Sequence, residues 1–204
     1  RVVWSVPIAA VVLIWLGRTQ DIRAAFRSPR TMGMALITAA LITVNWLIYV
    51  WSVGAGRAVE TALGYYINPL FSIFLGAVLL RERLDGRQKT AILLAVAAVG
   101  LLALETGGLP WVSVGLALTW GLYAFFKKSL PVGPNQGFFL EVLILTIPAI
   151  GFVAYIEFNG TGHFGSTGMT DVWLLLGCGL VTAVPLMIYA NGAKLLRLST
   201  IGIM

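Results

Sequence analysis

Residues 45–84 read NWLIYVWSVGAGRAVETALGYYINPLFSIFLGAVLLRERL, and this stretch decides the fold. Two long apolar runs are separated only by a short Gly-rich connection, yet they carry Asn45, Glu60 and Asn68. Polar and ionisable side chains are costly in a hydrocarbon environment unless they face protein or water. The meaning of these three residues therefore depends on the solvent that surrounds the runs.

The composition is that of a membrane protein. Of the 204 residues, 59% are hydrophobic and only 11% are charged, and the mean hydropathy is +0.92. Soluble domains carry about 25% charged residues. The net charge of +6 does not indicate a nucleic-acid partner, because the basic residues lie between the apolar runs and form no patch. The expected partner of the chain is a lipid bilayer.

Seven apolar runs are expected to be membrane-spanning helices, because backbone in lipid has to satisfy its hydrogen bonds internally. They are residues 1–17, 31–53, 58–80, 90–104, 111–127, 137–156 and 171–193, and an eighth run begins near Leu198. The chain starts inside an apolar run without Met and stops inside another. We therefore expect it to be an internal fragment of a longer membrane protein.

The connections between these runs alternate in charge. Twelve of the fourteen Lys and Arg residues lie in the connections 18–30, 81–89, 127–136 and 194–197. The opposite side holds only Arg1 and Arg57. By the positive-inside rule, the four basic connections are predicted to be cytoplasmic.

A short internal repeat has opposite directions in the two halves of the chain. Residues 53–66 align without a gap with residues 191–204, with three identities. The first copy follows a span that runs outward and the second follows a span that runs inward, so the second copy is inverted. Inverted repeats are a common construction of secondary transporters, which bind substrate at the repeat interface.

The quoted stretch resembles the RarD-type permeases of the EamA group, in the drug/metabolite transporter superfamily. Three later blocks fit the same pattern in the same order: LPWVSVGLALTWGLYAFFKKSLPVG, GFFLEVLIL and GLVTAVPLMIYANGAKLLRLSTIG. The resemblance implies an all-α polytopic protein of the bacterial cell (inner) membrane, with ten helices in two inverted five-helix repeats. This chain would run from helix two to the start of helix nine. Residues 1–104 would form most of the first repeat, and residues 111–204 part of the second.

Polar residues inside the second and third runs are candidates for a substrate pathway. Asn45 and Tyr49 share one helix face because they are four residues apart. Asn68 precedes Pro69, which removes a helix hydrogen bond and leaves a free carbonyl beside the amide. Tyr65 either lines a cavity or packs as an ordinary amphipathic side chain. We expect Asn45 and Asn68 to face an internal cavity.

Small residues share the helix face of Asn68. With Glu60 and Asn68 they form a ridge at a spacing of four, and the small residues are expected to serve helix packing: Gly64, Ser72 and Gly76. In the fifth run, Gly115, Thr119, Tyr123 and Lys127 form a similar ridge.

Aromatic and hydroxyl side chains extend the candidate pathway. Trp120 and Tyr123 offer surfaces that suit organic substrates by stacking and cation–π contact. Packing against lipid or core is the alternative for Trp120. Thr182 precedes Pro185, and its hydroxyl either restores hydrogen bonds that the proline removes or lines the pathway.

Two acidic residues are candidates for proton coupling. Glu141 lies inside the sixth run, where an ionisable side chain costs roughly 2.5–3.5 kcal/mol at the centre and is a functional candidate by default. The alternative for Glu141 is snorkelling to the interface or pairing with Lys127 or Lys128. Glu60 stands near the outer end of its run and is equally open to solvation or to pairing with Arg57.

The function expected from the resemblance is secondary transport. The substrates would be small organic metabolites or drug-like compounds, which the protein would export. An ion gradient would drive this export, and the proton is the candidate ion. No HExxH, GxSxG or Walker sequence is present, and His163 is the single histidine, so neither an enzyme nor a metal or other cofactor site is expected. A channel or a membrane scaffold without transport activity is the alternative.

Overall fold

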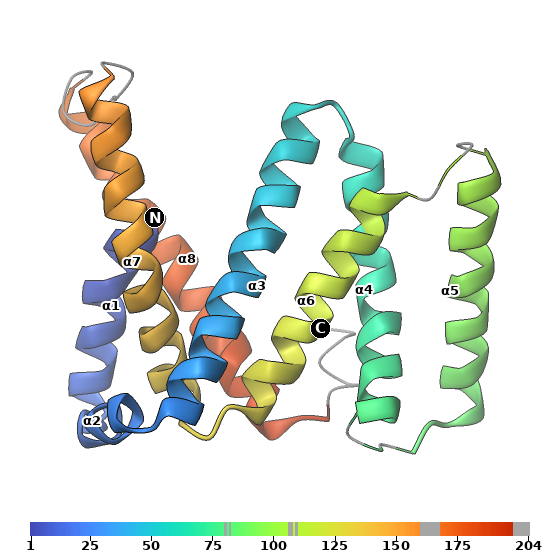
Figure 1. The fold of residues 1–204 in the computed structure, drawn as a ribbon, viewed down its shortest axis with the longest axis horizontal. Coiled ribbons are helices and arrows are strands. Elements are labelled where there is room, and N and C mark those ends of the chain that lie inside the picture. The colour runs from blue at the N-terminus through green and yellow to red at the C-terminus, as the bar shows by residue number, and fades with distance from the viewer. Residues whose placement is uncertain (80, 82, 106–107, 109, 160–167, 198–204) are drawn as a thin grey trace. The chain divides into compact units, whose positions relative to one another are not determined.

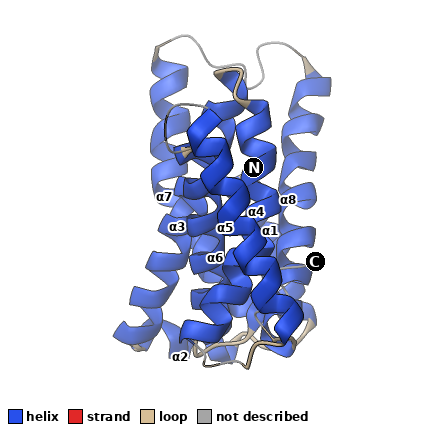
Figure 2. Cartoon of the chain, turned by 90° about the vertical axis from the view of Figure 1, so that its right-hand side faces the viewer, coloured by secondary structure: helices blue, strands red, loops and turns tan. Residues whose placement is uncertain are grey.

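The computed structural model describes the whole chain except residues 80, 82, 106–107, 109, 160–167 and 198–204. The described residues form eight α-helices and, as Figure 2 shows, no strand. In chain order the helices are α1 (Val2–Trp15), α2 (Gln20–Arg27), α3 (Pro29–Gly54), α4 (Ala58–Leu79), α5 (Gly86–Glu105), α6 (Trp111–Ser129), α7 (Pro134–Phe158) and α8 (Met169–Leu195). His163, the run expected from Leu198 and half of the second repeat copy (198–204) lie outside the described residues.

Each of the seven predicted runs is a helix, so the prediction of an all-α polytopic membrane protein is confirmed. In the described part of the chain, α3, α4, α7 and the portion of α8 from Val172 are long and apolar enough to cross a membrane. Helix α1 is a shorter apolar helix of 14 residues.

Helix α2 lies within the connection predicted for residues 18–30. Its end charges match the helix dipole, with Asp21 in the first turn and Arg27 in the last. On its buried face, Ala25 packs in one cluster with Ala35 and Leu140. Its eight residues are too short to span a bilayer, and reading for apolar runs alone passed over it.

The described chain forms two compact units. The first unit comprises residues 1–39 and 130–191, which include α1, α2, the start of α3, α7 and nearly all of α8. Its core joins Ala9 of α1 with Phe138 and Val142 of α7 and with Ala183 and Met187 of α8.

The second unit comprises residues 40–129 and continues from Gly192. It contains the larger part of α3 with α4, α5 and α6, and α4 packs against both α5 and α6. Figure 1 shows α3 and α4 as a helical hairpin joined by a short turn. Because these units are defined by contact and the expected repeats by chain order, the repeat boundaries at 1–104 and 111–204 stay a prediction.

Candidate functional site

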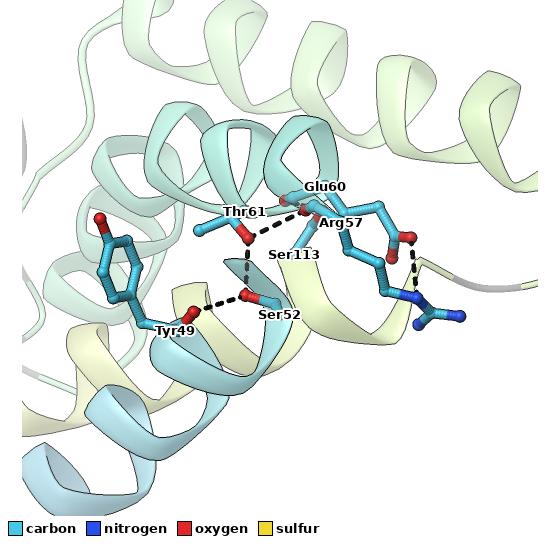
Figure 3. A network of polar contacts seen from close by, with 6 residues as sticks. All are labelled: Tyr49, Ser52, Arg57, Glu60, Thr61 and Ser113. Atoms are coloured by element: carbon cyan, nitrogen blue, oxygen red, sulfur yellow. Dashed lines mark hydrogen bonds and ion pairs between the residues drawn. The ribbon is translucent and has the colours of Figure 1, made fainter. Parts of the chain in front are cut away.

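A chain of hydroxyl groups joins α3 to α4 near their shared turn. Ser52 Oγ and Thr61 Oγ1 are 2.6 Å apart and hydrogen-bonded across the hairpin. The Ser52 hydroxyl also contacts the Tyr49 carbonyl oxygen at 2.9 Å, and the Thr61 hydroxyl contacts the Arg57 carbonyl oxygen at 3.0 Å. Figure 3 shows this network, which fixes the register of α3 against α4.

Helix α6 approaches α4 closely at the same end of the second unit. The Ser113 hydroxyl donates to the Glu60 carbonyl oxygen at 2.6 Å (Figure 3). A Cβ on Gly64 would lie only 3.0 Å from Leu116 Cβ and 3.1 Å from Ser113 Cα. The helices can pack at this distance only because residue 64 has no side chain, as small residues permit in membrane helices.

The predicted ridge on α4 is confirmed as a buried face. Gly64, Asn68, Ser72 and Gly76 are all buried. Asn68 is 8% exposed and sits in the middle of α4, and its Oδ1 accepts no hydrogen bond from the described residues. The next residue, Pro69, lacks the N–H that would bond to the carbonyl oxygen four residues earlier. An unsatisfied amide oxygen therefore lies inside an apolar helix, next to a residue that cannot donate a backbone hydrogen bond.

Asn45 is fully buried and connects α3 to α6. Its Nδ2 donates to the Leu116 carbonyl oxygen at 3.1 Å and to Thr119 Oγ1 at 2.8 Å. Its Oδ1, in contrast, has no hydrogen-bond donor among the described residues. The Nδ2 group of the amide thus links two helices, while its buried oxygen has no donor in the described part of the chain.

The register brings Asn45 and Asn68 to the same depth in the second unit. Ser52 is opposite Thr61, and one turn further the rings of Tyr49 and Tyr65 meet edge-on with centroids 6.0 Å apart. One more turn along each antiparallel helix leads to Asn45 and Asn68. We call this arrangement of two amides the asparagine layer.

Contacts on α6 support the same placement of the asparagine layer. Asn68 lies between Gly64, whose neighbour is Leu116, and Phe71, whose neighbour is Gly121. It therefore faces the same turn of α6 to which Asn45 is bonded.

Aromatic side chains flank the asparagine layer. Tyr49 is 40% exposed and Tyr65 is 43% exposed, so each ring has one buried and one open side. On α6, the Trp120 and Tyr123 rings have centroids 5.7 Å apart. Tyr123 is fully buried, and Lys127 Nζ lies 5.7 Å from its ring centroid. Six of the predicted pathway residues thus belong to the second unit.

The end of the second unit near Arg57 carries a cluster that the sequence did not predict. The Arg57 guanidinium lies 5.6 Å from the ring centroids of both Trp51 and Trp111, which are themselves 5.1 Å apart. Arg57 Nε also pairs with Glu60 Oε1 at 3.6 Å. The pairing that was left open for Glu60 is therefore present. The two tryptophans at helix ends beside a single arginine were the available signal for the cluster.

Glu141 and Thr182 belong to the first unit. Glu141 is 2% exposed and lies on α7 between the core residues Phe138 and Val142. Thr182 is half-buried on α8, next to the core residue Ala183. Their helices share one core, but roles for Glu141 and Thr182 stay predictions.

An apolar groove of about 370 Å³ runs along another face of α4. Its walls come from α4, α5 and α6, and none of the predicted site residues lines it. Among the described residues, no three or more His, Cys, Asp or Glu side chains lie together as they would in a metal site.

Comparisons with known proteins identify the family of the chain. The EamA-like transporter family matches residues 2–104. Protein RarD of Streptomyces exfoliatus is 39% identical over 204 residues, which cover all of this chain and 65% of that protein. The uncharacterized transporter YojE of Bacillus subtilis is 35% identical over all of this chain and 69% of that protein. Protein RarD of Escherichia coli is 33% identical over 99% of this chain and 68% of that protein.

The chain thus spans about two thirds of the length of these relatives, with 65% coverage of the Streptomyces protein. No solved structure matches it. The family match covers half of the chain, and the relatives cover essentially all of it. The chain therefore belongs to the EamA-like transporter family, as a RarD-type permease of the drug/metabolite transporter superfamily.

Proposed function

We propose that the protein is a secondary transporter that exports small organic molecules by alternating access. The observation that carries this proposal is the asparagine layer. Asn45 and Asn68 place buried amide oxygens without hydrogen-bond donors from the described residues inside helices that can cross a membrane. Polar groups at such a depth are costly and typically mark a pathway for a substrate or ion. Family membership supports transport in preference to the scaffold alternative.

The pathway would use the side chains that flank the asparagine layer. Tyr49, Tyr65, Trp120 and Tyr123 present aromatic surfaces in the same unit as Asn45 and Asn68. Thr182 of α8 belongs to the first unit and stays a separate candidate for the pathway. Aromatic rings beside amides provide both a stacking surface and hydrogen-bonding groups, which together suit small organic substrates.

The orientation follows from the basic connections. We assign the connections 18–30, 81–89, 127–136 and 194–197 to the cytoplasm and the protein to the cell (inner) membrane, since these connections hold twelve of the fourteen Lys and Arg residues. The Arg57 end of the second unit would then face the outside.

Proton coupling would depend chiefly on Glu141. It is a buried ionisable group on a helix that is long enough to span the membrane. Such a group can alternate between a protonated and an ionised form as water access changes. Glu60 is the weaker candidate, because its carboxylate already pairs with Arg57 near the helix ends.

Flux measurements test this function. The full-length protein would be reconstituted into proteoliposomes and supplied with radiolabelled aromatic and cationic compounds, with empty liposomes as the control. A transporter shows saturable uptake and counterflow. Linear conductance without saturation would indicate a channel, and the absence of flux for every compound would favour a scaffold. Either of the last two results would overturn the proposal.

A further inference from the structure

The hydrogen bonds around Asn45 have a fixed direction. The Thr119 hydroxyl donates to the Gly115 carbonyl oxygen at 2.7 Å, so it accepts at 2.8 Å from Asn45 Nδ2. The same Nδ2 donates to the Leu116 carbonyl oxygen at 3.1 Å. A flipped amide would set its oxygen against that carbonyl oxygen, and neither atom can donate. Asn45 Oδ1 therefore has to point away from these partners and can only accept.

Asn68 is the second amide of the layer, and its side chain makes no hydrogen bond in the described structure. Its side chain is 8% exposed, and its buried Oδ1 meets no donor in the described part of the chain. Leaving a buried acceptor unsatisfied is costly. Two such acceptors at one depth point to a molecule with a hydrogen-bond donor that both oxygens can share.

The charges of the surrounding helices select a neutral molecule. In α3, α4 and α6 together, Glu60 is the one carboxylate, and it is paired with Arg57 near the helix ends. Neutral amide oxygens do not compensate for the desolvation of an ion.

The rings beside the layer select an aromatic molecule. Tyr49 and Tyr65 are one turn away from Asn45 and Asn68, and both remain partly exposed. Edge-to-face and offset contacts with such rings contribute beyond simple apolar burial.

We propose that the asparagine layer binds a neutral aromatic molecule through an N–H or O–H donor. The hydrogen of this donor is shared between Asn45 Oδ1 and Asn68 Oδ1, and the ring lies against Tyr49 and Tyr65. This inference rests on the proposed transport function, because it names the substrate class of that same site.

Two pairs of probes that differ by one donor test the chemistry. Indole and 1-methylindole form one pair, and phenol and anisole form the other. Binding would be measured by calorimetry on the full-length protein in lipid nanodiscs. We expect the donor-bearing member of each pair to bind about tenfold more tightly, the effect of one buried hydrogen bond. Equal affinities within each pair, or no saturable binding, would overturn the inference.

A matched pair of variants separates ligand binding from folding. Asn68→Leu removes an amide with no hydrogen bond in the described structure, so the melting temperature should not fall, whereas indole affinity should drop about tenfold. Ser113→Ala removes the bond to the Glu60 carbonyl oxygen and should lower the melting temperature without changing indole affinity. A lower melting temperature with unchanged affinity for Asn68→Leu would contradict the binding role.

The outcomes also separate this inference from the transport proposal. Saturable flux of other compounds without binding of either donor-bearing probe would overturn the inference alone. Donor-dependent indole binding without flux of any compound would uphold the inference and overturn transport.

Discussion

Replacing Gly64 with alanine should force α4 away from α6. The added Cβ would lie 3.0 Å from Leu116 Cβ and 3.1 Å from both the Cα and the carbonyl oxygen of Ser113. Two of these three neighbours are backbone atoms, so no rotamer change can relieve the overlap. The helices have to separate, which weakens the packing that holds Asn68 beside α6.

The size of the effect follows from two opposing contributions. Overpacking typically costs about 1–3 kcal/mol, and alanine in place of a mid-helix glycine returns up to about 1 kcal/mol of helix propensity. Gly64→Ala should therefore lower the free energy of unfolding by about 0–2 kcal/mol. Gly100 in α5 has no atom within 4 Å of its would-be Cβ. Gly100→Ala keeps only the propensity gain and should stabilise by up to about 1 kcal/mol.

Equilibrium unfolding by increasing SDS in mixed micelles, followed by circular dichroism, would compare the two variants with the unmodified protein. We expect Gly64→Ala to be about 1–3 kcal/mol less stable than Gly100→Ala. If Gly64→Ala were as stable as Gly100→Ala or more stable, the inference that α4 and α6 approach each other closely at Ser113 would be wrong.

Two further predictions concern coupling and packing. Glu141→Gln should abolish transport driven by a pH gradient in proteoliposomes while leaving counterflow intact. Glu60→Gln should have a milder effect, because that carboxylate is ion-paired with Arg57. Full gradient-driven transport by Glu141→Gln would exclude proton coupling at this residue. Gly121→Ala should destabilise by about 1–3 kcal/mol, since its Cβ would lie 2.5 Å from Phe71 Cδ1. Phe71→Leu should restore part of that loss in the SDS assay, and purely additive effects would contradict the contact.

Hydropathy and spacing were sufficient to predict the seven helices formed by apolar runs and one buried helix face. A long apolar run has few structural solutions in a membrane, which is why all seven runs are helices. A spacing of four identifies residues on one side of a helix, and Gly64, Asn68, Ser72 and Gly76 are indeed buried together.

Hydropathy and spacing could not predict which helices contact each other. The bond from Asn45 to the Leu116 carbonyl oxygen joins residues 71 positions apart, and its acceptor is backbone that no side-chain pattern reveals. Periodicity marks which face of a helix is polar, but not which neighbour it meets. The roles of Glu141 and Thr182 depend on the same kind of long-range placement, and they stay predictions.

The contacts near Arg57 close a triangle. Ser52 bonds to Thr61 between α3 and α4, Ser113 bonds to the Glu60 backbone between α4 and α6, and Trp51 stacks with Trp111 between α3 and α6 (Figure 3 shows the first two). These contacts join all three pairs of helices at the same end of the second unit. Any relative motion of these three helices during a transport cycle would thus keep the Arg57 end as its fixed point, and α6 would stay with α4 where Gly121 packs against Phe71.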